Sequence, residues 1–223
     1  MKGLKTAIVN NNVDPFAQGR IQITLPSLTT PIHIWARMGN LYATNHAGVT
    51  FIPEIGDEVI VGFLNDDIRY PIILGSLHSS TQQQPITIKE GNTAKAITTF
   101  SGLKIAFDDD RKTITIATPA GNSVSINDDE KSILIKDQNG NQINMTPDGI
   151  LIDSAKNIEL NAKGEIIFNA QQQLSAIAKG DVKIAGLNIN ATADMGIEII
   201  GNAAAELSSN GQTVIKGTMV MIN

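Results

Sequence analysis

The stretch that decides the fold is Ile150–Ile184, which reads ILIDSAKNIELNAKGEIIFNAQQQLSAIAKGDVKI. Within it, two apolar residues separated by one other residue recur every eight positions. After one step of seven, the period of eight resumes and continues to the end of the chain. The doublets are Ile150/Ile152, Ile158/Leu160, Ile166/Phe168, Leu174/Ala176, Val182/Ile184, Ile189/Ala191, Ile197/Ile199, Ala205/Leu207 and Thr213/Ile215, with Met221 opening the last repeat.

The fixed period indicates short strands stacked along one axis, because eight residues make one strand and one corner. An apolar strand face is buried only if another strand covers it. Two arrangements satisfy this requirement. One chain could coil alone with three octads per turn, or three chains could intertwine with one octad each per layer. Small inward residues such as Ala176, Ala191 and Ala205 favour three chains, because three faces then meet on a narrow axis.

For three chains, we expect the inward doublets to form the core of the trimer. These residues are Ile150, Ile152, Ile158, Leu160, Ile166, Phe168, Val182, Ile184, Ile189, Ile197, Ile199, Leu207 and Ile215. Upstream, similar doublets from Ile105/Phe107 to Ile143/Met145 are nine or ten residues apart and have longer turns between them. The Asn139-Gly140 pair is a strong hairpin signal. We therefore predict a β-helical stem over residues 100–223, preceded by a linker or lead-in over residues 81–99.

Residues 1–80 follow a different pattern, with short alternating apolar runs separated by turns. Examples are the alternation of Ile21, Ile23 and Leu25, and the runs Val59–Phe63 and Ile72–Leu74. About five short strands with no convincing helix predict a small closed barrel. This region holds most of the large aromatic residues, and we expect Trp35 and Tyr70 to be core or junction residues. The predicted fold class is therefore all-β.

Composition and charge exclude several classes of protein. The chain has 223 residues, a net charge of −5 and no cysteine, so disulfides and thiol chemistry are excluded. The negative charge disfavours a nucleic-acid or anionic-membrane binder. No apolar run approaches the ~18 residues that span a bilayer. The first residues lack the features of a secretory signal, so we expect synthesis in a reducing cytoplasm.

The barrel region resembles a known family through a series of motifs. They are Gly19-Arg20-Ile21-Gln22-Ile23-Thr24-Leu25-Pro26, Trp35-Ala36-Arg37, Ala47-Gly48, Phe51–Phe63 and Tyr70–Leu77. In this order and spacing they are similar to the OB-fold of the VgrG and phage baseplate spike family, and Phe51–Gly75 is the most specific part. The stem resembles that family's triple-stranded β-helix.

The resemblance implies a homotrimeric, non-enzymatic spike in a contractile injection machine. Such a machine is a type VI secretion system, an extracellular phage-tail-like particle or a contractile phage tail. The spike pierces the target cell envelope and is then ejected or released with the particle. The implied partners are hub or baseplate proteins, inner-tube proteins, a tip protein and effector cargo. The family's large hub domain does not precede the barrel in this sequence, so we expect either a fragment of a longer spike or a short spike that binds a separate hub protein. Some phage spikes of the family end in an iron-binding His-x-His needle, and because His33, His46 and His78 all precede the stem, we expect no iron tip here.

The last strand is the candidate binding site. A stacked stem exposes apolar side chains and unpaired backbone at its final layer, which makes that layer an association surface. By the resemblance, a PAAR-type cap protein would bind there; the alternative is an end that frays in solvent. The residues concerned are Met219, Val220, Met221, Ile222 and Asn223.

No catalytic, metal or cofactor site is expected. The acidic runs Asp108-Asp109-Asp110 and Asp128-Asp129-Glu130 lack the spacing of calcium-binding loops, so we interpret them as solvated turns. No histidine follows His78 to activate a serine. The alternative function is a β-helical polysaccharide-binding or polysaccharide-degrading protein. It is disfavoured because Arg111 is the only arginine and Phe168 the only aromatic residue of the stem after position 110.

Overall fold

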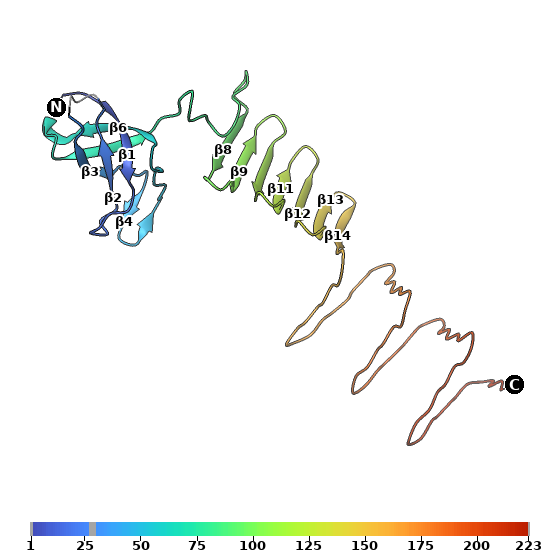
Figure 1. The fold of residues 1–223 in the computed structure, drawn as a ribbon. Coiled ribbons are helices and arrows are strands. Elements are labelled where there is room, and N and C mark those ends of the chain that lie inside the picture. The colour runs from blue at the N-terminus through green and yellow to red at the C-terminus, as the bar shows by residue number, and fades with distance from the viewer. Residues whose placement is uncertain (1, 27–29, 223) are drawn as a thin grey trace. The chain divides into compact units, whose positions relative to one another are not determined.

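A computed structural model describes residues 2–26 and 30–222 of the chain. The chain divides into two units, Met1–Leu160 and Asn161–Asn223. The first unit contains all the strands of the described residues, in a barrel, a long sheet and a small hairpin (Figure 1). This arrangement confirms the predicted all-β class.

The barrel is closed by five strands in the order β1-β2-β3-β7-β6. Their bounds are β1 Lys5–Asn11, β2 Arg20–Thr24, β3 His33–Met38, β6 Glu58–Phe63 and β7 Pro71–Ser76. All neighbouring pairs are antiparallel except β3 and β7, which are parallel. A short hairpin of β4 (Ala43–Thr44) and β5 (Ala47–Gly48) and the 3₁₀ turn η1 (Leu64–Asp66) lie in the connections. The predicted small barrel is therefore confirmed.

The barrel core follows directly from alternation along the strands. Every second residue points inward and is apolar, so these side chains are excluded from water while their neighbours face outward. Of the two aromatic residues expected in the core or at a junction, Trp35 is half-buried and Tyr70 is exposed. The buried residues are Ala7, Val9, Ile21, Ile23, Leu25, Ala36, Val59, Val61 and Ile73.

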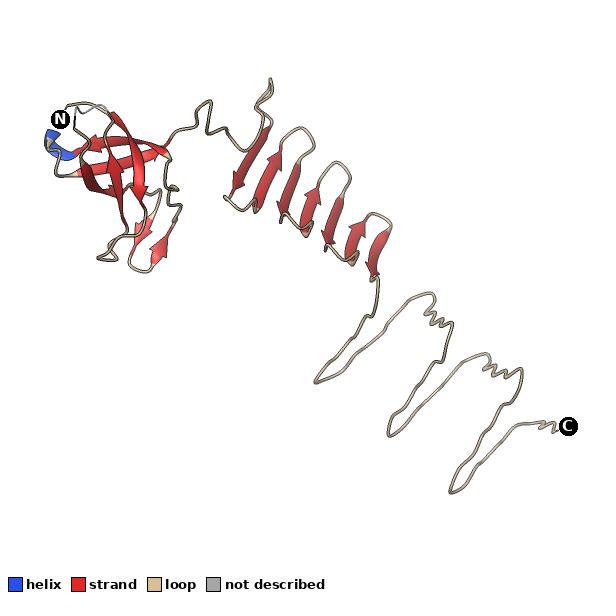
Figure 2. Ribbon diagram, in the orientation of Figure 1, coloured by secondary structure: helices blue, strands red, loops and turns tan. Residues whose placement is uncertain are grey.

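The long sheet is an antiparallel meander in which each strand pairs with the next along the chain (Figure 2). Its strands are β8 Ala94–Thr98, β9 Lys104–Asp108, β10 Thr113–Ala117, β11 Ser123–Asn127, β12 Ser132–Lys136, β13 Gln142–Thr146 and β14 Gly149–Asp153. The sheet begins at Ala94, within the segment expected as a linker. Its hairpins confirm the turns predicted between the longer-spaced doublets.

The second unit, over its described residues 161–222, has neither helix nor strand (Figure 2). Its side chains are exposed. The strands expected at the octads therefore do not form within one chain. A β-strand needs a neighbouring strand to accept and donate its backbone hydrogen bonds. Each octad is long enough for one strand only, so it cannot form a hairpin with itself. The triple-stranded stem stays a prediction.

Candidate functional site: the apolar face of the meander

One face of the meander carries two rows of side chains across its seven strands; the first row is apolar throughout and the second is apolar except at Lys95 in β8. Strand register places residues of neighbouring strands directly opposite each other, so the rows follow from pairs such as Ile116 with Val124 and Ile114 with Ile126. The first row is Ile97, Ile105, Ile116, Val124, Ile135, Ile143 and Ile152. The second row is Lys95, Phe107, Ile114, Ile126, Ile133, Met145 and Ile150.

These rows are not covered within the chain. Ile116, Ile126 and Ile135 remain 50%, 41% and 41% exposed. The opposite face is far less apolar, because its central row is Ala96, Ala106, Thr115, Ser125, Leu134, Asn144 and Leu151. A large contiguous apolar surface of this kind marks an association site. The difference in polarity between the two faces therefore indicates that the face with the two apolar rows is the one that a partner would cover.

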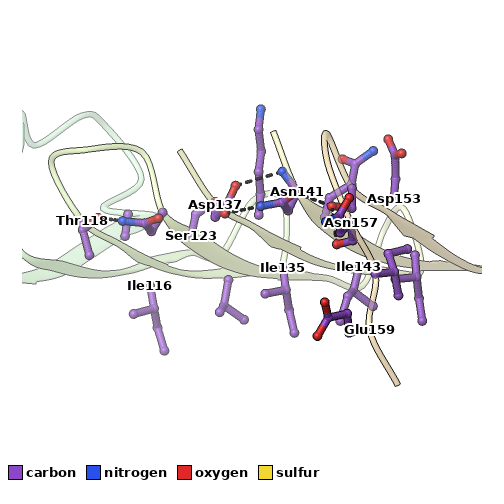
Figure 3. Close-up of a pocket in the computed structure, with 18 residues that line it drawn as sticks. Ile116, Thr118, Ser123, Ile135, Asp137, Asn141, Ile143, Asp153, Asn157 and Glu159 are labelled. Atoms are coloured by element: carbon purple, nitrogen blue, oxygen red, sulfur yellow. Dashed lines mark hydrogen bonds between the residues drawn. The ribbon is translucent and has the colours of Figure 1, made fainter. Parts of the chain in front are cut away.

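A hollow of about 700 Å³ lies over the end of the meander that contains β14. Its apolar lining comes from the first row and continues past the sheet to Ile158. Figure 3 shows Ile116, Ile135 and Ile143 projecting from one side of the sheet, with Asp137 and Asn141 in the polar turns at its edge. The hollow is thus part of the apolar face rather than a separate polar cleft.

The turns at this edge are linked to one another through asparagine side chains. Asn122 Nδ2 donates to Thr118 Oγ1 (3.0 Å), and Asn122 Oδ1 accepts from the backbone N–H of Gln138 in the next turn (3.1 Å). Asn141 Oδ1 accepts in the same way from the N–H of Ala155 (3.1 Å). It also accepts from the Ser154 hydroxyl (2.9 Å). The turn at residues 118–122 is therefore fixed to the turn at 137–141, and that turn to the segment that follows β14.

Asp137 completes this asparagine network. Its carboxylate accepts from Asn141 Nδ2 (2.7 Å) and from the backbone N–H of Asn141 (2.9 Å) and Asn139 (2.8 Å). These bonds, with the side-chain amide of Asn141 foremost, lower the pKa of Asp137 to about 2. Because the carboxylate oxygens accept these hydrogen bonds within the turn, Asp137 has a structural role there and is not positioned as a free acid or base.

The acidic runs at the other edge also serve the turns, as expected. Asp108 Oδ1 accepts from the backbone N–H of Asp110 (3.1 Å) and Arg111 (3.2 Å). Lys112 Nζ pairs with Asp129 of the next turn at 2.8 Å, which raises the pKa of Lys112. Within residues 2–26 and 30–222, no group of three or more His, Cys, Asp or Glu side chains is placed to hold a metal ion.

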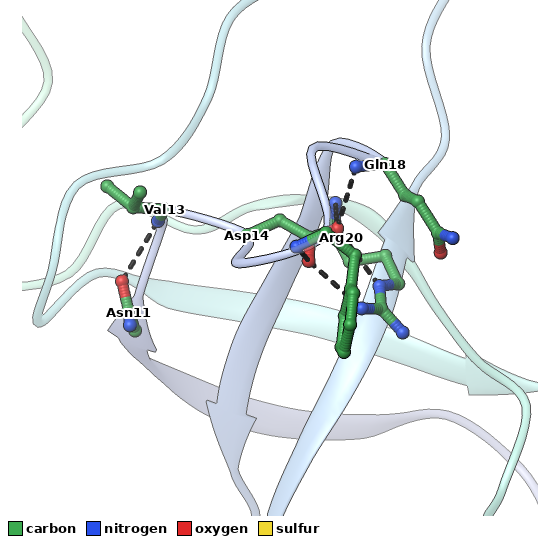
Figure 4. A network of polar contacts seen from close by, with 6 residues as sticks. Asn11, Val13, Asp14, Gln18 and Arg20 are labelled. Atoms are coloured by element: carbon green, nitrogen blue, oxygen red, sulfur yellow. Dashed lines mark hydrogen bonds and ion pairs between the residues drawn. The ribbon is translucent and has the colours of Figure 1, made fainter.

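In the barrel, the loop between β1 and β2 is organised by Asp14 (Figure 4). Its side chain is only 3% exposed and accepts from the backbone N–H of Phe16, Gln18 and Arg20 at 3.0–3.1 Å. The Arg20 guanidinium donates to it at 2.9 and 3.0 Å and, with these N–H groups, holds the pKa of Asp14 well below its usual range. Arg20 also lies 5.4 Å from the Phe16 ring and 5.6 Å from the Trp35 ring. Because Asp14 neutralises Arg20, this aromatic cluster offers no free cation to nucleic acid.

The site residues predicted from the octads fall into two groups. Ile150 and Ile152 lie in β14 at the end of the two apolar rows, together with the upstream doublets. The remaining predicted core residues, Ile158, Leu160, Ile166, Phe168, Val182, Ile184, Ile189, Ile197, Ile199, Leu207 and Ile215, are exposed and lie outside the strands. The structure brings none of these later residues together within one chain.

At the C-terminus, the predicted cap-binding residues Met219, Val220, Met221 and Ile222 are exposed, whereas Asn223 lies outside the described residues.

Two features were missed from the sequence. The rows from Ile105 to Met145 were seen as stem doublets but not named as core, and the asparagine links between turns were not anticipated. The recurrence of asparagine after glycine, at Asn122 and Asn141, was the available signal for the links. No helix in the described part of the chain is long and apolar enough to cross a membrane.

Comparison with known proteins matches both structural parts of the chain. Residues 5–78 match the type VI secretion system/phage-baseplate injector OB domain, which covers all five barrel strands. Residues 113–175 match the phage baseplate V C-terminal trimerisation domain, which includes β10 to β14. Together the two matches cover more than half of the chain.

Each curated relative matches one stretch of 65–86 residues. The chain is 40% identical over 65 residues to the actin cross-linking toxin VgrG1 of Vibrio cholerae, covering 29% of this chain and 6% of the relative. It is 31% identical over 86 residues to the type VI secretion system spike protein VgrG3 of Vibrio cholerae, covering 36% and 8%. It is 31% identical over 67 residues to the spike protein VgrG5 of Pseudomonas aeruginosa, covering 30% and 8%. The chain thus spans less than a tenth of the length of these relatives.

Proposed function

We propose, from the membership of this chain in the injector-spike family of type VI secretion systems and phage baseplates, that it forms the central spike of a contractile injection machine. The observation that carries the proposal is the uncovered apolar face of the meander, of which strands β10 to β14 lie within the region matched to a trimerisation domain. A face this large requires a partner surface of equal length, and further copies of the same sheet provide one.

The trimer we propose places three meanders around a common axis with their apolar rows inward. In a cyclic trimer each copy contacts the next head to tail, so the two rows of turns that flank a sheet can differ. Here one row of turns is linked by Asn122 and Asn141, and the other contains the Lys112–Asp129 ion pair. Ile150 and Ile152 then begin the buried axis of the stem, and the octads from Ile158 to Ile215 continue it. Closing the stem in this way leaves few free strand edges along its length.

The role we infer is mechanical rather than enzymatic. A stiff rod transmits the force of contraction to a small tip. Met219–Ile222 would bind a PAAR-type cap protein, and the barrel would contact hub, baseplate or inner-tube proteins. Effector cargo would travel with the spike. The protein would assemble in the bacterial cytoplasm and leave it with the particle.

The proposal is tested in two steps. Light scattering of the purified chain should give about three times its mass of 23.8 kDa. In the native host, deletion of the gene should abolish contraction-dependent killing or cargo release, and the full-length gene should restore it. A stable monomer, or injection that persists without the gene, would refute the proposed function. Cleavage of a polysaccharide by the purified protein would instead support the alternative enzyme class.

A further inference from the structure

The turn between β12 and β13 contains the Asn139-Gly140 pair, which has a reactivity of its own in addition to its role in the hairpin. In such a pair the backbone nitrogen of the glycine can attack the side-chain carbonyl carbon (Cγ) of the asparagine, because the two atoms close a five-membered ring. Glycine has no Cβ to obstruct this approach. Asparagine therefore counts among the thermolabile residues of proteins. The local structure decides whether the reaction proceeds in the folded chain.

Both residues of the pair are accessible in the folded turn. Asn139 and Gly140 are exposed and lie outside the strands, so the pairing of β12 with β13 does not hold their backbone. Within residues 2–26 and 30–222, the N–H of Gly140 makes no hydrogen bond. The attacking nitrogen is therefore not held by an acceptor, and solvent water reaches the turn.

The side chain of Asn139 is held in this turn by Asp137, and only weakly. Nδ2 of Asn139 donates to Asp137 Oδ2 at 3.2 Å, whereas the backbone N–H of Asn139 donates to Asp137 Oδ1 at 2.8 Å. A distance of 3.2 Å is at the upper end of the usual range for N–H···O hydrogen bonds. The side-chain amide can therefore rotate towards Gly140 at the expense of one long hydrogen bond.

The other Asn-Gly pair of the chain, Asn210-Gly211, provides an internal comparison. The N–H of Gly211 donates to Ser209 Oγ at 3.1 Å, so the corresponding nitrogen is held by an acceptor there. Every other asparagine that precedes a residue precedes one with a side chain, which hinders the attack. Among the asparagines of the chain, Asn139 therefore combines a following glycine with an unbonded attacking nitrogen.

We propose that Asn139 is a site of spontaneous modification, at which its side-chain amide is lost by cyclisation onto Gly140. The Gly140 nitrogen forms a bond to Cγ of Asn139, and the Cγ–Nδ2 bond breaks. The proton of the Gly140 nitrogen passes through water to the leaving nitrogen, which departs as ammonia. Water then opens the resulting succinimide. Opening at Cγ gives aspartate, and opening at the backbone carbonyl gives isoaspartate, in which the main chain runs through Cβ and Cγ. Water is the only co-reactant and no atom is oxidised or reduced, so the reaction does not rest on the proposed trimer.

Either product changes the turn that holds the segment after β14. The Nδ2 donor is replaced by a carboxylate, which faces the carboxylate of Asp137 and repels it. Isoaspartate also lengthens the main chain of the turn by an additional carbon atom. Asp137 accepts from Asn141, and Asn141 accepts from the N–H of Ala155. Modification of Asn139 therefore loosens the attachment of Ala155 to the turn.

The test is peptide mapping by mass spectrometry of the purified full chain during incubation at neutral and mildly alkaline pH, with isoaspartate identified by enzymatic methylation. We expect aspartate and isoaspartate to accumulate several-fold faster at residue 139 than at residue 210. The rate should rise with pH, because the attacking nitrogen must lose its proton. In urea the two pairs should react at similar rates, since the difference comes from the fold. Modification that is slower at residue 139 than at residue 210, or absent at residue 139, would overturn the proposal, because the folded turn would then protect Asn139.

A matched pair of variants separates the modification from its effect on the turn. Asn139→Gln should remove the reaction at residue 139, because glutamine would have to close a six-membered ring, and Asn210→Gln should leave that reaction unchanged. Hydrogen exchange of the Ala155 amide should become faster with incubation in the wild type and in Asn210→Gln, but not in Asn139→Gln. Equal exchange before and after incubation of a modified wild-type sample would refute the proposed loosening of the turn.

Discussion

Placing a charge on the apolar face should prevent trimer formation, and two adjacent residues of β11 make a matched test. Ile126 lies in the second apolar row, and its neighbour Ser125 lies in the central row of the opposite face. Ile126→Lys and Ser125→Lys therefore introduce the same side chain one position apart in sequence, on opposite sides of the sheet.

The size of the effect follows from exposure. Ile126 retains 41% of its accessible surface in the single chain. Since complete burial of an isoleucine contributes about 1.5–3 kcal/mol, covering the remainder contributes about 0.6–1.2 kcal/mol per chain, or about 2–4 kcal/mol per trimer. Ile126→Lys loses this contribution and also places three ammonium groups near the axis. Burying an unpaired charge costs several kcal/mol per ion, so the trimer should dissociate.

The assay is light scattering across a concentration series, with fluorescence of Trp35, the only tryptophan, as a separate report on the barrel. We expect Ile126→Lys to be monomeric with a folded barrel, Ser125→Lys to be trimeric, and Ile126→Val to be trimeric with a small loss of stability. If Ile126→Lys stays trimeric while Ser125→Lys dissociates, the other face of the sheet is inside the trimer and the reasoning is wrong.

Four further predictions concern the turns, the barrel loop and the tip. Asn141→Ala should lower the unfolding free energy by about 1–3 kcal/mol in urea titrations, because it removes hydrogen bonds between successive turns; an unchanged midpoint would contradict this. The pKa of Asp137 falls from 3.8 to about 2 on folding, so its contribution to stability is complete above pH 3.8 and is lost as the pH falls to about 2; Asp137→Asn should remove this part of the acid sensitivity measured by circular dichroism. Asp14→Ala should speed hydrogen exchange of the loop amides between β1 and β2, and equal rates would show that the loop is ordered by other contacts. Deletion of residues 219–223 should abolish co-purification of a PAAR-type cap protein while light scattering still reports a trimer; retained binding would place the platform elsewhere.

The barrel was predictable because its strands alternate strongly apolar residues with polar ones, as Ile21, Ile23 and Leu25 do. β1 and β8 were not identified, because the inward positions of β1 include the small residue Ala7 and those of β8 are Lys95 and Ile97, which give little periodic apolar signal. The exposure of Tyr70 could likewise not be predicted from the sequence. A large aromatic residue next to a strand can face either the barrel core or the solvent.

The apolar rows of the meander were half predicted. The doublets gave the inward residues, but only strand register shows that Ile116, Val124 and Ile135 form one continuous line. The hydrogen bonds of Asn141 to Ser154 and Ala155 form because two segments approach each other in space, and such an approach produces no periodic pattern in the sequence. No strand forms after Asp153 in the described part of one chain, and in the proposed trimer the groups that would pair with these residues belong to other copies.

The repeated hairpins of the meander also bear on how such a protein changes over evolutionary time. Each hairpin adds two strands, and therefore about 9.4 Å at ~4.7 Å per strand, and pairs with its neighbours through the same antiparallel register. A duplicated or deleted hairpin would preserve the direction of the sheet, the two apolar rows and the alternation of edges. Length is thus a modular property of this fold, which can be matched to envelopes of different thickness without redesigning either end.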